Sequence, residues 1–367
     1  MTSRPRAGDG ETGRQPEEST LPVRLGFVGT GGIAKRHLAV AKGSAEMQVV
    51  AACDLDIERA RQVAAEHGCG AFDDFRQMYD QARPDAVVVC VPPFAHGDVE
   101  VEAAERGIHL FVEKPVALDM QVAERVLAAI REAGVIAQVG YMYRLCRTIE
   151  RVREILGERP IAMVQAYYFA GGMPNRAWWP KMSGSGGQLV EQATHMVDLG
   201  RYLVGEVATV SGLTATVRDW QPPAGWPGPD SWQVKYAEGF EIPDTAALLM
   251  RYETGAIGTL SCSMVPQASW TNGMTVVAEG ARVHIAGPTP DISWETEEGT
   301  GEMPAEEDWS AHILVEFVRA VAAGGAVSGP YAAGVRTLAV SLAGDASAAR
   351  GGEPVTVAEM LPAQLRG

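Results

Sequence analysis

The first half of this chain alternates short apolar segments with segments of helical spacing, and this alternation restricts the possible folds more than any other feature. The apolar segments are Val23–Val28, Gln48–Asp54, Ala86–Val91, Ile108–Val112 and Val135–Val139. Strands that are apolar along their whole length are buried on both faces, and strands separated by helices pair in parallel. The pattern therefore predicts an α/β Rossmann domain, a doubly wound parallel sheet, over residues 21–142.

From about residue 143 the pattern changes to strands separated by turn residues. The predicted strands are Ile161–Phe169, Ala208–Val217, Thr245–Tyr252, Ala256–Met264 and Met274–Ile285, and the predicted helices are Arg147–Leu156, a segment near Gln188–Leu203, Ser310–Ala323 and Ala332–Ala349. This spacing predicts an α+β C-terminal domain over residues 143–367, with a large, mostly antiparallel, open-faced sheet. The open face predicts a homodimer or homotetramer through that sheet. Residues 1–20 are predicted to form a disordered leader, and Gln221–Glu241 a long ordered loop.

Composition argues against several classes of partner and location. The net charge of −15 disfavours nucleic acid and anionic membrane surfaces, because an acidic protein cannot neutralise either. No apolar run approaches the ~18 residues that cross a membrane. The five cysteines are odd in number and scattered, without disulfide or zinc spacing. This usage is typical of a reducing compartment, and we predict a cytoplasmic protein.

A glycine-rich turn joins the first predicted strand to the first predicted helix. Its sequence, Gly29-Thr30-Gly31-Gly32-Ile33-Ala34, fits G-x-G-x-x-A. The first glycine allows a tight turn, the second lets the backbone approach a pyrophosphate, and the helix N-terminus offers unpaired N–H groups. A glycine-rich turn in a nucleotide-free α/β protein is the alternative, but the strand before it and the helix after it favour NAD binding by residues 29–33.

Further cofactor positions lie at the predicted carboxyl ends of the next strands. Asp54 is placed to accept hydrogen bonds from an adenosine ribose, and an acid there favours NAD over NADP. Arg59 and Lys35 could shift that preference, so NADP stays possible. The rigid turn Val91-Pro92-Pro93-Phe94-Ala95-His96 follows another strand, at the edge where doubly wound sheets bind ligands. Its His96 either contacts the cofactor or caps a helix.

The segment Phe111-Val112-Glu113-Lys114-Pro115 places a lysine at the end of a buried strand. The chain has only five lysines, so arginine fills most basic positions. A lysine ammonium is compact and can change its pKa when it is desolvated, which a guanidinium cannot do. Lys114 is therefore either a catalytic or ligand-holding residue, or the solvated end of a strand that Pro115 terminates.

In the second half, the segment Gly186-Gly187-Gln188-Leu189-Val190-Glu191-Gln192-Ala193-Thr194-His195-Met196-Val197-Asp198 is the strongest candidate site. Glu191, His195 and Asp198 have the spacing i, i+4 and i+7, which places them on one face of a continuous helix. A histidine between two carboxylates can be held in one tautomer and tuned near neutral pH, as a general acid/base requires. A solvated helix face is the alternative. No further cluster completes four ligands, so we predict no metal.

Polar and aromatic residues near the domain junction are candidates for substrate binding. Trp178, Trp179 and Lys181 lie in a loop that leads into the candidate site, where indoles could stack on a nicotinamide or a sugar. Tyr143 and Arg144 follow the last strand of the first domain and could donate hydrogen bonds to a substrate. Packing between the domains is the alternative role for the tryptophans.

Together these motifs resemble the glucose-fructose oxidoreductase/inositol dehydrogenase/rhizopine-catabolism (Gfo/Idh/MocA) family. The resemblance rests on GTGGIAKRH, DAVVVCVPPFAH, HLFVEKP, VGYMYR and GGQLVEQATHMVD, in this order from Val23 onward. It implies that Lys114 holds the reacting hydroxyl or carbonyl and contacts the cofactor beside Glu113. It further implies that His195 is the acid/base and that position 191 lines the substrate pocket. The family more often has aspartate at that position, and Glu191 is longer by one methylene.

The resemblance and the residues together predict an NAD(P)-dependent dehydrogenase or reductase. Its substrate would be a secondary alcohol or ketone of a sugar, inositol or related polyol. Two alternatives are an enzyme that cleaves glycosides through transient oxidation by tightly held NAD, and a non-catalytic dinucleotide sensor. Hydride leaves a carbinol carbon as the hydroxyl proton is removed, so the chemistry needs a base, His195, and a cation, Lys114.

Overall fold

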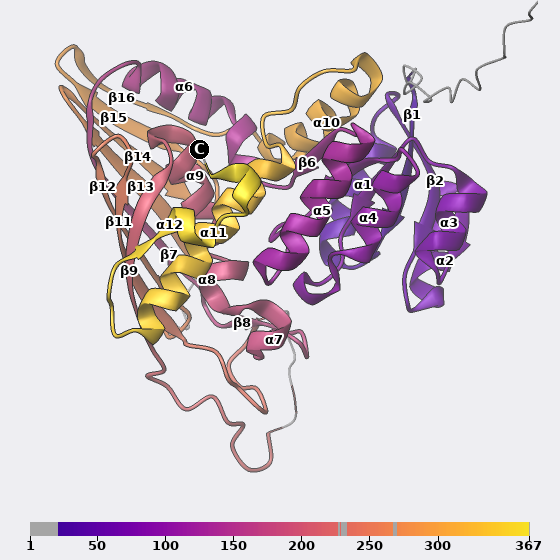
Figure 1. Ribbon diagram of the computed structural model, residues 1–367, viewed down its shortest axis with the longest axis horizontal. Coiled ribbons are helices and arrows are strands. Elements are labelled where there is room, and N and C mark those ends of the chain that lie inside the picture. The colour runs from indigo at the N-terminus through magenta and orange to yellow at the C-terminus, as the bar shows by residue number, and fades with distance from the viewer. Residues whose placement is uncertain (1–20, 227, 229–232, 267–269, 367) are drawn as a thin grey trace, which may run out of the picture.

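The computed structural model describes residues 21–226, 228, 233–266 and 270–366. Two layered domains lie side by side (Figure 1), each built on its own sheet. The leader predicted for residues 1–20 and part of the predicted 221–241 loop lie outside the described residues.

The N-terminal domain is a parallel sheet with helices around it. Its described strands are β1 (Val23–Val28), β2 (Met47–Cys53), β3 (Gly70–Phe72), β4 (Ala86–Val89), β5 (His109–Val112) and β6 (Ala137–Val139), in the order β3-β2-β1-β4-β5-β6. Its helices are α1 (Gly32–Lys42), α2 (Ile57–His67), α3 (Phe75–Ala82), α4 (Asp98–Glu105) and α5 (Met120–Ala133). The order reverses between β1 and β4, which leaves a crevice at the carboxyl ends of these strands. The predicted Rossmann fold is confirmed.

Local signals explain why several of these elements begin and end where they do. All four residues of β4 are buried, as a central strand covered on both faces requires. Helix α5 starts after Asp119, whose side chain accepts from Val122 N at 2.9 Å, and ends at Gly134 with a φ of 67°. Such left-handed backbone favours glycine. These signals act within a few residues and could be read without the rest of the chain.

The C-terminal domain is built on a nine-stranded sheet within the described residues. Its strands in spatial order are β16 (Gly299–Met303), β15 (Ile292–Thr296), β14 (Ala281–Gly287), β13 (Thr271–Ala278), β7 (Ile161–Phe169), β12 (Ile257–Ser263), β11 (Thr245–Tyr252), β9 (Val207–Ala215) and β17 (Val355–Thr356). Of these neighbouring pairs, only β7 and β12 run parallel. The predicted large, mostly antiparallel sheet is therefore confirmed.

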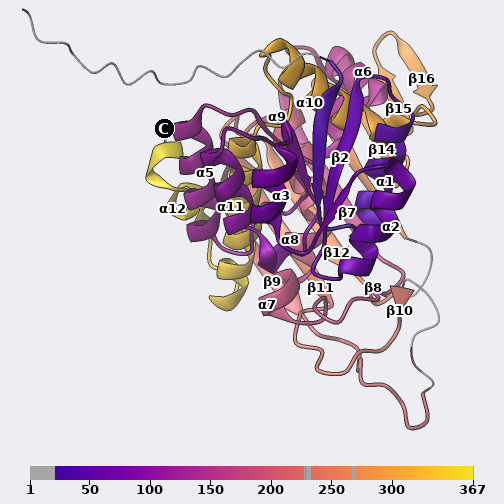
Figure 2. The same cartoon turned by 90° about the vertical axis from the view of Figure 1, so that its right-hand side faces the viewer.

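The remaining helices cover one face of this sheet or connect it to the first domain. They are α6 (Arg147–Leu156), α7 (Met182–Ser185), α8 (Gly187–Glu191), α9 (Thr194–Val204), α10 (His312–Ala323), α11 (Tyr331–Ala349) and α12 (Val357–Met360). A short ribbon of β8 (Met173–Pro174) and β10 (Gln233–Val234) lies at the lower right of Figure 2. Helix α10 packs against the N-terminal domain. Its Phe317 contacts Phe111 of β5 edge-on, with 5.7 Å between the ring centroids. The domain boundary at 142/143 stays a prediction.

Two sequence-based predictions of elements differ from the structure, and several elements were not predicted. The predicted strand Met274–Ile285 is a hairpin of β13 and β14, turning at Gly280, where φ is 65°. The predicted helix near Gln188–Leu203 is two helices, α8 and α9. Strands β3, β15 and β16 and helix α3 were not predicted. Strand β3 has only three residues and β15 and β16 only five each, too few for periodicity to show.

Candidate functional site

A cavity of about 1150 Å³ runs from the glycine turn of the first domain to the loops and helices of the second. The residues of the predicted site that line it are Gly29, Gly31, Gly32, Ile33, Asp54, Val91, Pro92, Glu113, Lys114, Trp179, Glu191 and His195. Side chains from β7, α1 and the loop after β8 complete the wall. The cavity therefore joins the predicted cofactor residues to the predicted catalytic residues.

The glycine turn has the local geometry that a dinucleotide needs. Gly29 has a φ of 82°, and a Cβ there would lie 2.5 Å from the Cys90 carbonyl oxygen. A Cβ on Gly31 would meet nothing within 4 Å, so the space beside this residue is free for a ligand. Helix α1 starts at Gly32 without a side-chain cap and without an acid in its first turn. Its N–H groups and its positive end are thus available to an anion, and the turn fits a dinucleotide diphosphate.

Asp54 is held in place by the glycine turn itself. Its Oδ2 accepts hydrogen bonds from Thr30 N and Thr30 Oγ1, both at 2.8 Å, and its Oδ1 accepts from Asp56 N at 3.0 Å. Thr30 is buried and does not appear among the residues that line the cavity. Thr30 therefore orients the carboxylate that faces the predicted ribose site.

Lys114 meets Glu191 across the domain junction. Its Nζ donates to the Glu191 carbonyl oxygen at 2.7 Å and to Glu191 Oε1 at 3.1 Å. The other carboxylate oxygen, Oε2, accepts from Trp179 Nε1 at 3.1 Å, and Trp179 is fully buried. Two of the three ammonium N–H donors are occupied, and one remains for a ligand in the cavity.

His195 lies at the cavity wall, 8% exposed, in a largely apolar setting. The rings of Tyr141 and Tyr143 meet its imidazole edge-on, with centroids 6.1 and 6.0 Å away. Its Nδ1 is buried without a hydrogen-bond partner among the described residues, so Nε2 is the nitrogen available to a substrate. Burial, and then the positive charge of Lys114, lower the pKa of His195 well below its ordinary value of 6.5. The imidazole is therefore neutral near pH 7 and can accept a proton.

The structure corrects the prediction that Glu191, His195 and Asp198 share one helical face. The helix breaks after Glu191, where Gln192 N and Ala193 N both donate to the Gln188 carbonyl oxygen, at 3.0 and 2.9 Å. Neither carboxylate forms a hydrogen bond to His195 in the described structure. The pKa of His195 is thus lowered by burial and by the charge of Lys114. The predicted flanking carboxylates do not set it.

Asp198 and Arg144 form a buried ion pair below the cavity. Arg144 donates from Nε and Nη2 to the two carboxylate oxygens of Asp198, at 2.7 and 2.6 Å. Thr337 Oγ1 of α11 donates to the same carboxylate at 3.0 Å. Neither member of the pair lines the cavity. The two residues, predicted to bind the substrate, instead stabilise helix α9 from within the protein.

Three more predicted residues lie away from the cavity lining. The Tyr143 hydroxyl donates to Asn272 Oδ1 at 3.3 Å, and its ring stacks on Trp309. His96 is buried with Glu100, whose Oε1 lies 2.5 Å from His96 Nδ1. Glu100 Oε2 in turn accepts from Gly97 N at 2.6 Å, at the start of α4. This position at the start of α4 fits the helix-capping alternative for His96 better than contact with the cofactor. Lys181 is exposed at the start of α7.

Sequence reasoning missed several residues that line the cavity. His37 of α1 pairs with Glu113: Nε2 and Oε1 are 2.7 Å apart, and both residues are buried. Its position one turn after Ile33 was the available signal. The missed lining residues from distant segments are Arg36, Tyr168, Arg176, Gln192, Trp270 and Ser310. No spacing rule connects these residues, because they come together only when the two domains pack.

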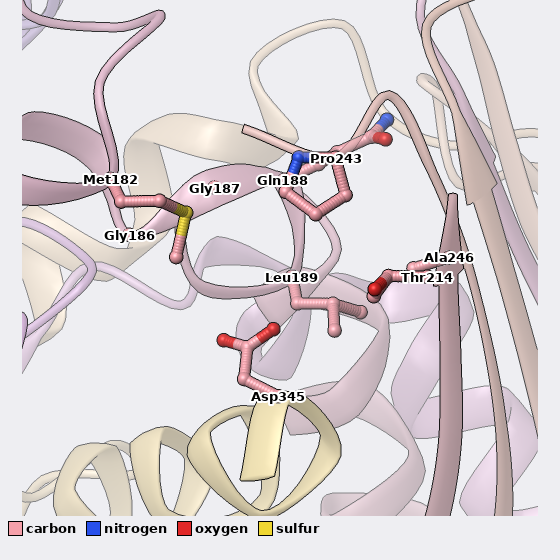
Figure 3. A pocket seen from close by; sticks show the side chains of 9 residues that line it. All are labelled: Met182, Gly186, Gly187, Gln188, Leu189, Thr214, Pro243, Ala246 and Asp345. Carbon is pink, nitrogen blue, oxygen red and sulfur yellow. The ribbon is translucent and has the colours of Figure 1, made fainter. Parts of the chain in front are cut away.

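A second, much smaller cavity of about 10 Å³ lies behind α8, with room for about one water molecule (Figure 3). Asp345 of α11 projects towards it, close to Leu189 and Met182. Both side-chain amide atoms of Gln188 are buried without a hydrogen-bond partner among the described residues. Burial raises the pKa of Asp345 from its ordinary value of 3.8 to about 7.

This buried carboxyl makes the stability of the protein depend on pH. Because the folded state binds the proton more tightly than the unfolded state, the free energy of unfolding should fall as pH rises from about 4 to about 7. The variant Asp345→Asn cannot ionise, so its gain in stability over wild type should be larger near pH 8 than near pH 5, by roughly 2 kcal/mol. Urea denaturation at both pH values measures this difference. Glu132→Gln, at an exposed position on α5, is the control, and equal gains of Asp345→Asn at both pH values would contradict the prediction.

Comparison with known proteins agrees with this geometry. The family model described as "Oxidoreductase family, NAD-binding Rossmann fold" matches residues 23–141. The model of the GFO/IDH/MocA C-terminal domain matches residues 154–284. Together the two models cover more than half of the chain. In the described part of the structure, no helix is long and apolar enough to cross a membrane.

Individual relatives share only part of their length with this chain. An uncharacterized oxidoreductase of Bacillus subtilis, YrbE, is 26% identical over 66% of this chain and 68% of its own. The scyllo-inositol 2-dehydrogenase (NAD(+)) of the same organism is 28% identical, and the match spans 56% of each protein. Matches such as this one therefore span little more than half of the curated relative.

Solved structures match over nearly their whole length. The complex of levoglucosan dehydrogenase with NADH aligns with a TM-score of 0.79 at 20% identity, over 91% of this chain and 99% of that one, which shows the shared fold. The WlbA dehydrogenase of Bordetella pertussis, in complex with NADH and UDP-GlcNAcA, aligns with a TM-score of 0.75 at 26% identity, over 91% and 98%. With both family models matched in order along one chain, this protein belongs to the Gfo/Idh/MocA family of NAD-binding oxidoreductases.

Proposed function

We propose that this protein is an NAD-dependent dehydrogenase that oxidises a secondary hydroxyl of a neutral sugar, inositol or related polyol, or reduces the matching ketone. The observation that carries the proposal is the meeting of Lys114 and His195 at one cavity that begins at the glycine turn. One residue comes from each domain, so the site assembles at their junction. Bound NAD supplies the hydride acceptor.

The two side chains have the complementary roles that alcohol oxidation requires. Neutral His195 accepts the hydroxyl proton at Nε2, and its lowered pKa keeps it in the accepting form near pH 7. The remaining N–H of Lys114 stabilises the negative charge that develops on the substrate oxygen. Glu191 holds the ammonium through two contacts and is itself fixed by Trp179, so it positions Lys114.

The lining of the second domain supports a neutral polyhydroxylated substrate. Aromatic rings gather there, from Tyr168, Trp178, Trp179 and Trp270. Such rings can pack against the apolar C–H faces of sugars, while Glu191 and Gln192 lie beside them as polar groups. Relatives named as inositol and D-glucoside dehydrogenases point to the same substrate class.

A panel of neutral pyranoses, inositols and their keto forms tests the proposal, with NAD(H) or NADP(H) and nicotinamide absorbance as the readout. We expect turnover of at least one neutral polyol with NAD, because the Asp54 carboxylate at the predicted ribose site repels a 2′-phosphate. Binding of NADH without turnover of any member would contradict the substrate class. Cleavage of a glycoside without NADH accumulation would indicate the transient-oxidation alternative.

We also propose that two copies of the chain associate through the open face of the C-terminal sheet. Along β11, side chains alternate strictly between a buried and an exposed face. Leu249 on that exposed face is 55% accessible, and its register partner on β12 is Thr259, two residues from the exposed Ile257. Apolar side chains exposed together on one face of a sheet are typical of a protein interface.

The oligomer proposal predicts a dimer of the wild-type protein in analytical ultracentrifugation. Leu249→Glu should weaken the dimer at least about tenfold, because it places a charge in the buried part of the interface. Val217→Glu changes another exposed apolar residue, 70% accessible and beyond the end of β9, and should leave the dimer intact. A monomeric wild type would contradict the proposal.

The prediction of a cytoplasmic location is likewise kept as a proposal. All five cysteines are free thiols in the structure. Unpaired cysteines are typical of proteins in reducing compartments.

A further inference from the structure

We propose that Arg176 of the C-terminal domain binds the diphosphate of the dinucleotide from the side opposite the glycine turn. Both domains would then hold the cofactor, and its release would be slow. Retention of the cofactor by Arg176 does not depend on the identity of the substrate.

The backbone around Arg176 presents its side chain to the first domain. Arg176 follows β8, its N donates to the Pro174 carbonyl oxygen at 2.8 Å, and its own carbonyl oxygen accepts from Trp179 N at 3.0 Å. Nη1 donates to the Asn175 carbonyl oxygen at 2.9 Å. Nη2 reaches across the cavity, to within 3.5 Å of the position that a Cβ on Gly32 would occupy. A residue of the second domain thus lies at the first residue of α1.

The electrostatics of this contact point to an anion. A guanidinium beside the positive end of a helix is unfavourable unless a negative charge lies with them. Helix α1 offers none, since its first turn has no acid and Gly31 provides no side-chain cap. Within the described residues, the guanidinium of Arg176 forms one hydrogen bond, to Asn175, and no ion pair. Unused donors therefore face each other from both sides of one cavity.

A dinucleotide diphosphate fits this arrangement of donors. Gly31 and Gly32 have no Cβ, so phosphate oxygens can approach the N–H groups of α1. The planar guanidinium offers a fork of donors to the same group from across the cavity. The match of the NAD-binding family model to residues 23–141 places such a ligand in this domain.

Two further contacts across the cavity hold the domains at this separation. The rings of Phe94 and Trp178 meet edge-on, with centroids 6.4 Å apart. Arg36 Nη2 of α1 donates to Ser310 Oγ at 3.0 Å. Each contact joins one residue of the first domain to one residue of the second. Together they keep Arg176 close to α1.

The test is to compare ligands that contain or lack the diphosphate. For Arg176→Ala, the Kd values of NADH and of ADP-ribose should both rise about 10- to 100-fold, and the NADH dissociation rate measured by stopped-flow fluorescence should rise in parallel. The Kd of adenosine, which has no phosphate, should change by less than about twofold. Arg176→Lys keeps the charge without the fork and should fall between wild type and Arg176→Ala.

Arg282→Ala is the matched control, because Arg282 is exposed, pairs with Glu295 on the C-terminal sheet and does not line the cavity. It should leave all three Kd values unchanged. Equal weakening of adenosine and NADH by Arg176→Ala, or no change in either, would overturn the assignment. No change in either Kd would also be expected if Arg176 bound a phosphate group of the substrate. Failure of the wild type to bind NADH would overturn the dinucleotide site and the role of Arg176 with it.

Discussion

Replacement of His195 by alanine is expected to lower kcat/KM for alcohol oxidation by about 10²- to 10⁴-fold, the range for removal of a general base. The physical reason is that Nε2 of this buried imidazole is the proposed proton acceptor of the site. The Kd of NADH should stay close to the wild-type value, because His195 is not among the residues proposed to bind the cofactor. Steady-state kinetics and direct cofactor titration measure the two quantities separately.

His67→Ala is the control for this substitution, since His67 ends α2 and does not line the cavity. It should retain full activity. A loss of less than about tenfold in His195→Ala would show that another group accepts the proton. For the wild type, the acidic limb of the kcat/KM profile should lie below pH 6.5, because only the protonated imidazole is inactive and its pKa is lowered.

Replacement of Lys114 by methionine is expected to lower kcat/KM by about 10²- to 10³-fold, as for the loss of one donor to a developing oxyanion. It should also move the acidic limb of the profile to higher pH. The positive charge of Lys114 disfavours the imidazolium, so removing that charge makes protonation of His195 easier and raises its pKa. Burial is the larger cause of the lowered pKa, so the limb should still lie below 6.5.

The variant Lys114→Arg separates charge from position. It keeps a positive charge beside His195, so its acidic limb should stay near that of the wild type. Its rate should nevertheless fall, because a planar guanidinium cannot reproduce the contacts of the ammonium with Glu191. An acidic limb at the same pH in Lys114→Met and in wild type would contradict the proposed coupling of the two side chains.

Much of the fold could be predicted because its signals act over short distances. Strands such as Val23–Val28 and Thr245–Tyr252 have the predicted bounds, since burial pattern and turn residues define them locally. Helix α5 is likewise bounded by local signals, Asp119 before it and Gly134 after it. The hairpin at Gly280 was missed, because a single glycine within a segment rich in strand-forming residues fits a continuous strand equally well until the register of β13 and β14 is known.

The members of the site could be predicted in part, and their contacts less so. The motif order along the chain pointed to Lys114, Glu191 and His195, and the structure brings all three to one cavity. The break between α8 and α9 was not predictable, because residues 187–204 have helical spacing throughout. Because of this break, His195 contacts the rings of Tyr141 and Tyr143 and not the two carboxylates.

The sequence by itself determined the two kinds of sheet and the glycine turn, because periodicity and backbone preferences depend on neighbours in the chain. Only the tertiary structure decided which groups meet across the domains. Lys114 with Glu191, and Arg176 with the start of α1, are separated by more than seventy residues in each pair. Burial and distance set the pKa of His195, and both exist only once the two domains have packed.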